Sequence, residues 1–167
     1  MNKTSIRKVL TRYAGSEFIN KEQLKKDMEA ASNQEFDEVP KGTYIISIDK
    51  MEVKPTKAGD KLMFAVQANI KETVSAPKKQ DKRKIFFNRV ICGNRVTEKW
   101  NDGAAIKGVI TWIEDLTGEK LEFVSYSQFS EDVLSLFQDF ADVIEAKVEY
   151  DPEVFNPISI KEVFDVD

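Results

Sequence analysis

Histidine is absent from this 167-residue chain, and cysteine occurs once, as Cys92. Structural zinc sites use cysteine and histidine ligands, and cysteine nucleophiles need a neighbouring base, so both kinds of site are excluded or nearly so. Cys92 lies in the apolar run KIFFNRVICG, where a free cysteine is most often buried. We therefore expect no metal site, no cofactor and no stabilising disulfide.

Long apolar runs are also missing. The first residues, MNKTSIRKVLTRYAGS, hold no apolar stretch long enough for a secretory signal. No other segment approaches the roughly 20 apolar residues that a membrane span requires. The chain also lacks a glycine-rich phosphate loop, an internal repeat and a low-complexity tract. We expect a cytosolic protein that is not secreted and has no membrane partner.

Positive charge is concentrated in one part of the chain and scarce in another. The net charge is −4. Residues 1–40 are balanced, residues 41–111 hold 15 lysines and arginines against 7 acidic residues, and residues 112–167 hold 3 against 15. Because charges are screened within about 8 Å at physiological ionic strength, a phosphate meets the local potential and not the total. The basic middle is compatible with nucleic-acid binding and equally with an ordinary solvated surface.

Residues 1–40 are polar and hold one thin apolar pattern. Asn20 stands at a helix-capping position, and Leu24 and Met28 follow at i, i+4 spacing. The later stretch SNQEFDEVPKG has the composition of a linker. We therefore predict an N-terminal arm with a short helix and a linker over residues 1–40, and one folded domain over residues 41–167.

From Thr43 onward, apolar and polar residues alternate as they do in strands with one buried face. The alternation slips by one residue near Asp49 and Lys50, which predicts a β-bulge that bends and twists a long first strand. Two further strands are predicted at LMFAVQANIK (62–71) and KIFFNRVICG (84–93). The basic connector ETVSAPKKQDKR joins these two strands.

Helical patterns follow the third strand. Residues 102–117 carry an apolar stripe at helical spacing, and Gly118 is placed to end that helix. A second helix is predicted to begin at Ser130, and two strands follow at about 146–151 and 158–166. Three strands, a helical insertion and two strands are the order of the oligonucleotide-binding (OB) fold. We predict a mostly β chain with helices (α+β): an OB-fold, a five-stranded antiparallel barrel with its helical insertion between strands 3 and 4.

Cations and aromatic side chains come together around the basic connector. Phosphates need positive charge and unstacked bases need flat apolar surfaces, so this combination is typical of a single-stranded nucleic-acid groove. The third strand has a phenylalanine on each face. Phe87 is assigned to the core, and Phe86 is expected to be exposed. The predicted DNA-binding residues are Lys61, Lys78, Lys79, Lys82, Arg83, Lys84, Phe86, Asn88, Arg95 and Trp100.

The run VPKGTYIISIDKMEVKPTKAGDKLMFAV, followed by KRKIFFNRVICGN, resembles the single-stranded DNA-binding proteins encoded in replication modules of phages of Gram-positive bacteria. The resemblance covers residues 39–94 most clearly, and the closing ISIKEVFD less so. It implies an OB-fold that binds single-stranded DNA in the host cytoplasm, without marked sequence preference, and that commonly self-associates. A departure is the closing EVFDVD, which continues directly from the start of the predicted last strand and not as a separate acidic tail that recruits partners.

The leading hypothesis is a non-catalytic protein that coats single-stranded DNA in phage replication or recombination. The sequence leaves open whether the chain also binds duplex DNA or RNA more weakly. It also leaves open whether replication or recombination proteins are partners and whether the chain forms a homodimer. The alternative is an OB-fold adaptor of a replication complex that uses its acidic half for recognition. Catalysis by a Mg²⁺ nuclease is disfavoured, because the acid pairs at 114–115 and 131–132 are adjacent on helices and do not face the same way.

Overall fold

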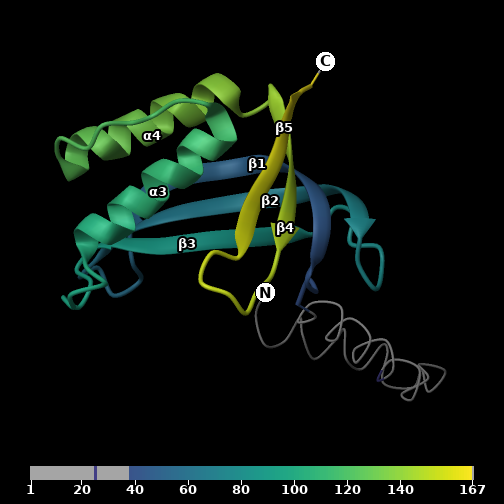
Figure 1. The fold of residues 1–167 in the computed structure, drawn as a ribbon, viewed down its shortest axis with the longest axis horizontal. Helices are drawn as coiled ribbons and strands as arrows, with labels where there is room; N and C mark the ends of the chain where they lie inside the picture. The colour runs from purple at the N-terminus through teal and green to yellow at the C-terminus, as the bar shows by residue number, and fades with distance from the viewer. Residues whose placement is uncertain (1–24, 26–37, 167) are drawn as a thin grey trace, which may run out of the picture. The chain divides into compact units, whose positions relative to one another are not determined.

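The computed structural model describes residue 25 and residues 38–166. The arm predicted over residues 1–40 lies outside the described residues, apart from Lys25 and the last three positions. The described fold is α+β, with five strands and two helices (Figure 1), which confirms the predicted class. The elements are β1 Gly42–Pro55, β2 Leu62–Ser75, β3 Lys84–Cys92, α3 Asp102–Thr117, α4 Tyr126–Phe140, β4 Ile144–Tyr150 and β5 Ile158–Asp165.

The long strand β1 joins the two parts of the sheet. Its first residues pair with β4, and β2 pairs along its whole length. The register shifts between Ile48 and Lys50, which confirms the predicted bulge. A bulge bends a strand and increases its twist, and β1 is visibly bent between its two parts (Figure 1). One strand can therefore serve two sheet segments that run in different directions.

All strand pairs are antiparallel, and the order in the sheet is β3-β2-β1-β4-β5. Within residues 38–166 the backbone hydrogen bonding of the sheet does not close on itself, and β3 and β5 are the two edges. Both helices lie between β3 and β4 in the chain, as predicted. Helix α4 contacts β1, and α3 contacts both β3 and β5.

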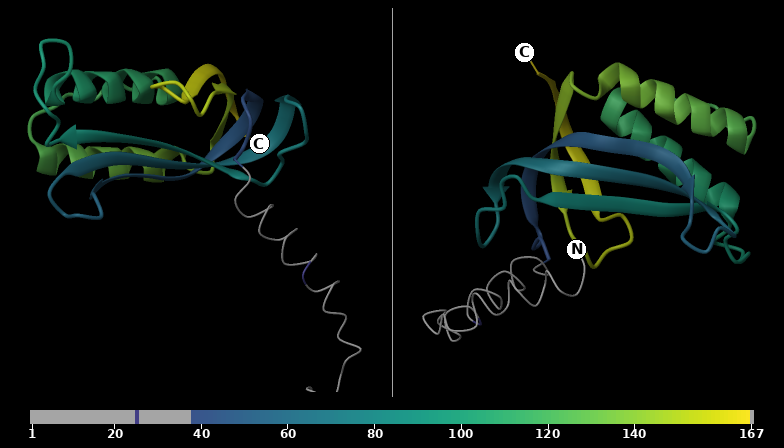
Figure 2. Two further views of the ribbon diagram at one scale, coloured as in Figure 1. Left: turned by 90° about the horizontal axis from the view of Figure 1, so that it is seen from below. Right: turned by 180° about the vertical axis from the view of Figure 1, so that it is seen from behind.

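One face of β1, β2 and β3 is covered by the two helices: α3 contacts β3, and α4 contacts β1. Ile46, Phe64 and Phe87 point inward and are at most 2% exposed. Trp112 of α3 stacks on Phe87, with 5.2 Å between ring centroids and 14° between ring planes. In the left view of Figure 2, α3 lies on one side of these strands. The alternate residues of the three strands therefore form a second face that points away from α3.

Helix α3 begins and ends where the sequence predicts. The Asn101 side chain accepts a hydrogen bond from the Ala104 amide (2.9 Å), which caps the first turn. Gly118 takes a left-handed conformation, φ 77°, and its N–H donates to the Glu114 carbonyl. A side chain at Gly118 would be strained in that conformation, so glycine is the natural terminator there.

The predicted start of helix α4 at Ser130 is wrong. The helix begins at Tyr126, and Ser125 is the cap, with its hydroxyl accepting from the Gln128 amide (3.1 Å). Both serines could have capped a helix. The earlier one does so because Phe129 is fully buried and extends the buried stripe by one turn.

Side chains bridge the opening between β3 and β5. Trp112 donates its indole N–H to the carbonyl of Ile158, the first residue of β5 (3.0 Å). Arg89 of β3 donates to the carbonyl of Phe155 (2.9 Å) and the side-chain oxygen of Asn156 (2.8 Å). Both acceptors lie in the loop that precedes β5. Arg89 thus joins β3 to the loop before β5, and Trp112 joins α3 to the first residue of β5.

No helix among the described residues is long and apolar enough to cross a membrane.

Candidate nucleic-acid interface

The face of β1, β2 and β3 that points away from α3 carries the predicted residues of β3. Lys50, Gln67 and Phe86 are neighbours in one row across the three strands. Phe86 is 52% exposed, as predicted, whereas Phe87 on the opposite face is 2% exposed. Asn88 is exposed two residues beyond Phe86. We call this surface the outer face, and its members are Lys50, Glu52, Lys54, Met63, Ala65, Gln67, Asn69, Lys84, Phe86, Asn88 and Val90.

Each lysine of the outer face lies beside a carboxylate. Glu52 is placed between Lys50 and Lys54, with its Oε1 3.4 Å and 3.7 Å from their ammonium nitrogens. Lys84 forms an ion pair with Asp49, the bulged residue of β1. Exposed pairs of this kind contribute about 0–1 kcal/mol to stability. A phosphate can therefore replace these carboxylates at little cost to the fold.

The loop between β2 and β3 is shorter than the predicted basic connector. β2 continues to Ser75, because its last residues pair with the start of β1. The remaining residues, 76–83, fold back along β2: Ile70 donates to the Arg83 carbonyl (2.8 Å) and accepts from the Lys82 amide (2.7 Å). Lys82 has a left-handed backbone, φ 72°. The loop therefore returns to the end of the outer face where Lys84 begins β3.

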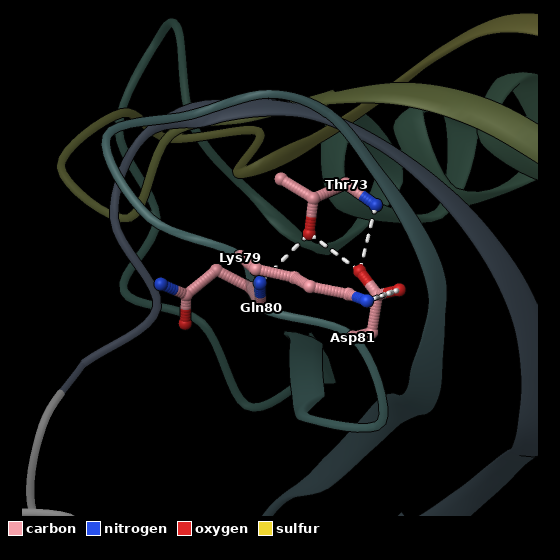
Figure 3. Close-up of polar contacts among 4 residues, drawn as sticks. All are labelled: Thr73, Lys79, Gln80 and Asp81. Atoms are coloured by element: carbon pink, nitrogen blue, oxygen red, sulfur yellow. Dashed lines mark hydrogen bonds and ion pairs between the residues drawn. The ribbon is translucent and has the colours of Figure 1, made fainter.

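Asp81 organises this loop through Thr73. The Asp81 carboxylate accepts hydrogen bonds from the Thr73 amide (2.9 Å) and hydroxyl (2.8 Å), and the Gln80 amide donates to that hydroxyl (2.7 Å). Figure 3 shows the Lys79 ammonium beside the same carboxylate, at 3.6 Å. Gln80 and Asp81 are thus tied to Thr73 of β2, and the Asp81 carboxylate offsets part of the loop's positive charge.

We expect the Asp81 network to be lost in acid. Hydrogen bonding from Thr73 is the main cause that lowers the pKa of Asp81 below its ordinary value of 3.8, and Lys79 contributes. Because the folded pKa is depressed, the network is complete above pH 3.8 and is lost as the pH falls through the lower folded value. An NMR titration should show the Thr73 amide shifting together with the Asp81 carboxyl signal. Independent titration of the two signals would contradict this coupling.

The four predicted loop cations differ in their surroundings. Lys78 and Lys82 are exposed, and Lys79 is exposed beside Asp81. Arg83 is half-buried and donates to the Gln80 side chain (2.8 Å). The three lysines are therefore presented to solvent, while Arg83 also helps to shape the loop.

The other predicted residues lie at the opposite end of β3. Lys61 directly precedes the β2 residue that pairs with the last residue of β3. Arg95 is exposed and Trp100 half-buried in the segment after β3. Asp102 fixes that segment by accepting from the Asn94 amide (2.8 Å). The ten predicted residues thus follow the length of β3, roughly 26 Å at about 3.3 Å per residue, and do not form one cluster.

A cluster at this end also contains an aromatic ring that the sequence did not single out. Phe155, in the loop between β4 and β5, is 61% exposed. The Arg89 guanidinium lies 3.7 Å from its ring centroid, and the Trp100 ring meets it edge-on at 4.7 Å. Burial lowers the pKa of Arg89 from its ordinary value, but a guanidinium stays charged at neutral pH.

Sequence reasoning missed Lys50 and Lys54 as members of the outer face. Their signal was present, because both alternate with Met51 and Val53, which continue the core pattern after the bulge. Phe155 had no comparable signal. It stands in a turn-like stretch, DPEVFNP, and only the contact with Arg89 distinguishes it.

Within residues 38–166, no three cysteine, histidine or acidic side chains are grouped so as to hold a metal ion.

No curated protein and no solved structure matches the chain. A family model described as "Protein of unknown function (DUF669)" matches residues 26–157. The matched range includes four of the strands, β1 to β4, and both helices, and it ends just before β5. Because the match covers more than half of the sequence, the chain belongs to this family.

Proposed function

We propose that this chain is a non-catalytic protein that binds single-stranded DNA along the outer face. The observation that carries the proposal is the exposed Phe86 ring on the edge strand β3, in one row with Gln67 and Lys50 on a face that also carries Lys54 and Lys84. An apolar ring that is half exposed on a sheet can stack a base, and the neighbouring lysines can neutralise the adjoining phosphates. The sequence resemblance to phage single-stranded DNA-binding proteins supports the same function, in replication or recombination in the host cytoplasm.

The strand arrangement supports an OB-fold for this function. The bulged first strand pairs with both β2 and β4, and the helices are inserted between β3 and β4. OB-folds are partly open barrels that bind oligonucleotides on the face of their second and third strands. In this chain a side-chain hydrogen bond joins β3 to the loop before β5, and another joins α3 to β5, and the partly open barrel is the arrangement we propose.

The expected energetics favour binding that does not depend on the base sequence of the DNA. A base stacked on an aromatic ring contributes about 1–3 kcal/mol, and every base has a flat face to stack. The lysines bind phosphates, which are the same at every nucleotide. Glu52 and Asp49 oppose this binding, because a phosphate must displace them from Lys50, Lys54 and Lys84. Binding should therefore be moderate in strength and steeply dependent on salt.

A titration with labelled oligo(dT), duplex DNA and single-stranded RNA at two salt concentrations tests the proposal. We expect oligo(dT) to bind most tightly and its affinity to fall as salt increases. Absence of binding at low salt would overturn the proposal and favour the alternative, an adaptor that uses its acidic half to recognise another protein. Duplex bound as tightly as oligo(dT) would contradict the stacking mechanism, because paired bases cannot stack on Phe86.

The double substitution Lys50→Gln and Lys54→Gln should flatten the salt dependence. Each phosphate contact on a single strand contributes a slope of about −0.7 in a plot of log affinity against log salt, so losing two should reduce the slope by about 1.4. The matched control is Lys107→Gln, an exposed lysine on α3, which covers the other face. An unchanged slope in the double variant, or an equal loss in the control, would place the bound strand elsewhere.

A further inference from the structure

Phe155 is an exposed ring held in a well-defined loop. It is 61% exposed, in the loop from Asp151 to Pro157. The ends of this loop are joined by a hydrogen bond from the Asp151 amide to the Pro157 carbonyl (2.9 Å), and the Asp151 side chain accepts from the Glu153 amide (3.0 Å). The loop is thus closed by its own hydrogen bonds, which fix the backbone that carries the Phe155 ring.

A buried arginine, Arg89, packs against one face of the Phe155 ring. Arg89 is 7% exposed, and its guanidinium lies 3.7 Å from the Phe155 ring centroid. The same group donates to the Phe155 carbonyl (2.9 Å) and to Asn156 (2.8 Å). Trp100 supports the ring from the side, at 4.7 Å and 85°. One ring face is therefore against the guanidinium, and the exposed area belongs to the rest of the ring.

This geometry suits stacking by a planar ligand. A ring fixed by its neighbours loses little conformational entropy when a base stacks on it. Arg89 places a positive charge directly under the ring, and cations beside a stacked base add to its binding. Arg95 and Lys99, both exposed in the segment that leads to Trp100, provide further positive charge nearby in the chain. The cluster thus presents a fixed ring together with cations.

The position of the cluster relates it to the outer face. Arg89 is three residues beyond Phe86 on β3, roughly 10 Å along the strand, and its side chain points to the opposite face. Among the described strands, β3 is an edge of the sheet. A single strand that leaves Phe86 can therefore pass over the free edge of β3 and reach Phe155.

We propose that Phe155 is a second base-stacking site and that bound single-stranded DNA crosses the free edge of β3 to reach it. This inference rests on the proposed function, since it extends the same bound strand. It assigns Phe155 as the stacking residue, Arg89 and Trp100 as the residues that position it, and a nucleobase as the ligand. The bound strand then follows a bent path from one face of β3 to the other.

The test compares Phe155→Ala with Val154→Ala, a variant of the neighbouring residue, which is 50% exposed but has no ring. The probes are oligo(dT) of about 4 and about 16 nucleotides, which are the limits of OB-fold site sizes. We expect Phe155→Ala to lower the affinity for the longer probe about 5- to 100-fold and to affect the shorter one much less. Val154→Ala should leave both affinities unchanged, and Phe155→Trp should retain them.

Tryptophan fluorescence gives a second readout. The chain has two tryptophans: Trp112 is 6% exposed, and Trp100 touches Phe155. We expect the longer probe to quench Trp100 in the wild type and to lose that effect in Phe155→Ala. If Phe155→Ala kept both the affinity and the quenching, this inference would be overturned. Wild-type binding of oligo(dT) would in that case still support the proposed function. Equal losses for both probes would overturn the path over the β3 edge. No wild-type binding would mean that the proposed function itself fails.

Discussion

Replacing Phe86 with alanine should weaken binding of single-stranded DNA about 5- to 150-fold, which corresponds to the loss of a stacked base worth about 1–3 kcal/mol. The Phe86 ring is half exposed on the β3 side of the outer face, and Gln67 and Asn88 beside it can stay in place when it is removed. Because the ring buries little surface within the protein, the free energy of unfolding should change by less than about 0.5 kcal/mol. Fluorescence anisotropy with labelled oligo(dT) and thermal unfolding would measure the two effects separately.

A suitable control is Leu134→Ala on α4. Leu134 is 47% exposed, close to the exposure of Phe86, and it lies on α4, which contributes no residue to the outer face. This variant should bind oligo(dT) as the wild type does. If Phe86→Ala bound as tightly as the Leu134 control, Phe86 could not be the stacking residue and the strand would not lie on the outer face.

The division of β3 into a core face and an outer face could be predicted from the sequence alone. Phe86 and Phe87 are adjacent, and only the alternation of side chains along a strand separates their roles. The apolar neighbours of Phe87 at alternate positions put it in the core, and it is stacked on Trp112. Local patterns of this kind also gave α3 its correct ends, through the apolar stripe over residues 102–117 and the glycine stop at Gly118.

Contacts between distant residues could not be predicted in this way. Arg89 and Phe155 are separated by 66 residues along the chain, and no pattern in either segment indicates that they meet. The alternation placed Arg89 on the core side of β3, where a charged group needs hydrogen-bond partners. The sequence did not show which groups would accept those hydrogen bonds. The same limit applies to Lys84 and Asp49, which come together only when β1 and β3 pair with β2.

The local charge balance was also hidden in the sequence. The basic middle of the chain predicts a strongly positive surface, yet Asp49, Glu52 and Asp81 lie directly beside lysines of the candidate site. Pairing depends on strand register and loop geometry, which a count of charges does not contain. The structure therefore changes the expected interface from a uniformly basic groove to a row of lysines whose carboxylate partners compete with phosphate.

Replacing Arg89 with methionine should both destabilise the fold and weaken binding of long oligonucleotides. Arg89 makes two charge-assisted hydrogen bonds to the loop before β5 and lies 5.2 Å from the Phe87 ring centroid. Hydrogen bonds to charged groups contribute about 1.5–3 kcal/mol each. Because the two acceptors are in exposed residues and can bind water instead, we expect the free energy of unfolding to fall by about 2–4 kcal/mol. Denaturant unfolding would measure this loss.

Binding distinguishes this role from simple destabilisation. If Arg89 positions Phe155, then below the unfolding transition Arg89→Met should reproduce most of the affinity loss of Phe155→Ala for the longer probe, and the double variant should bind no worse than either single one. Arg89→Lys keeps the charge but loses the planar guanidinium, so its affinity for the longer probe should lie between those of the wild type and Arg89→Met. Additive losses in the double variant would show that Arg89 and Phe155 act independently, with Arg89 then only a structural link between β3 and β5.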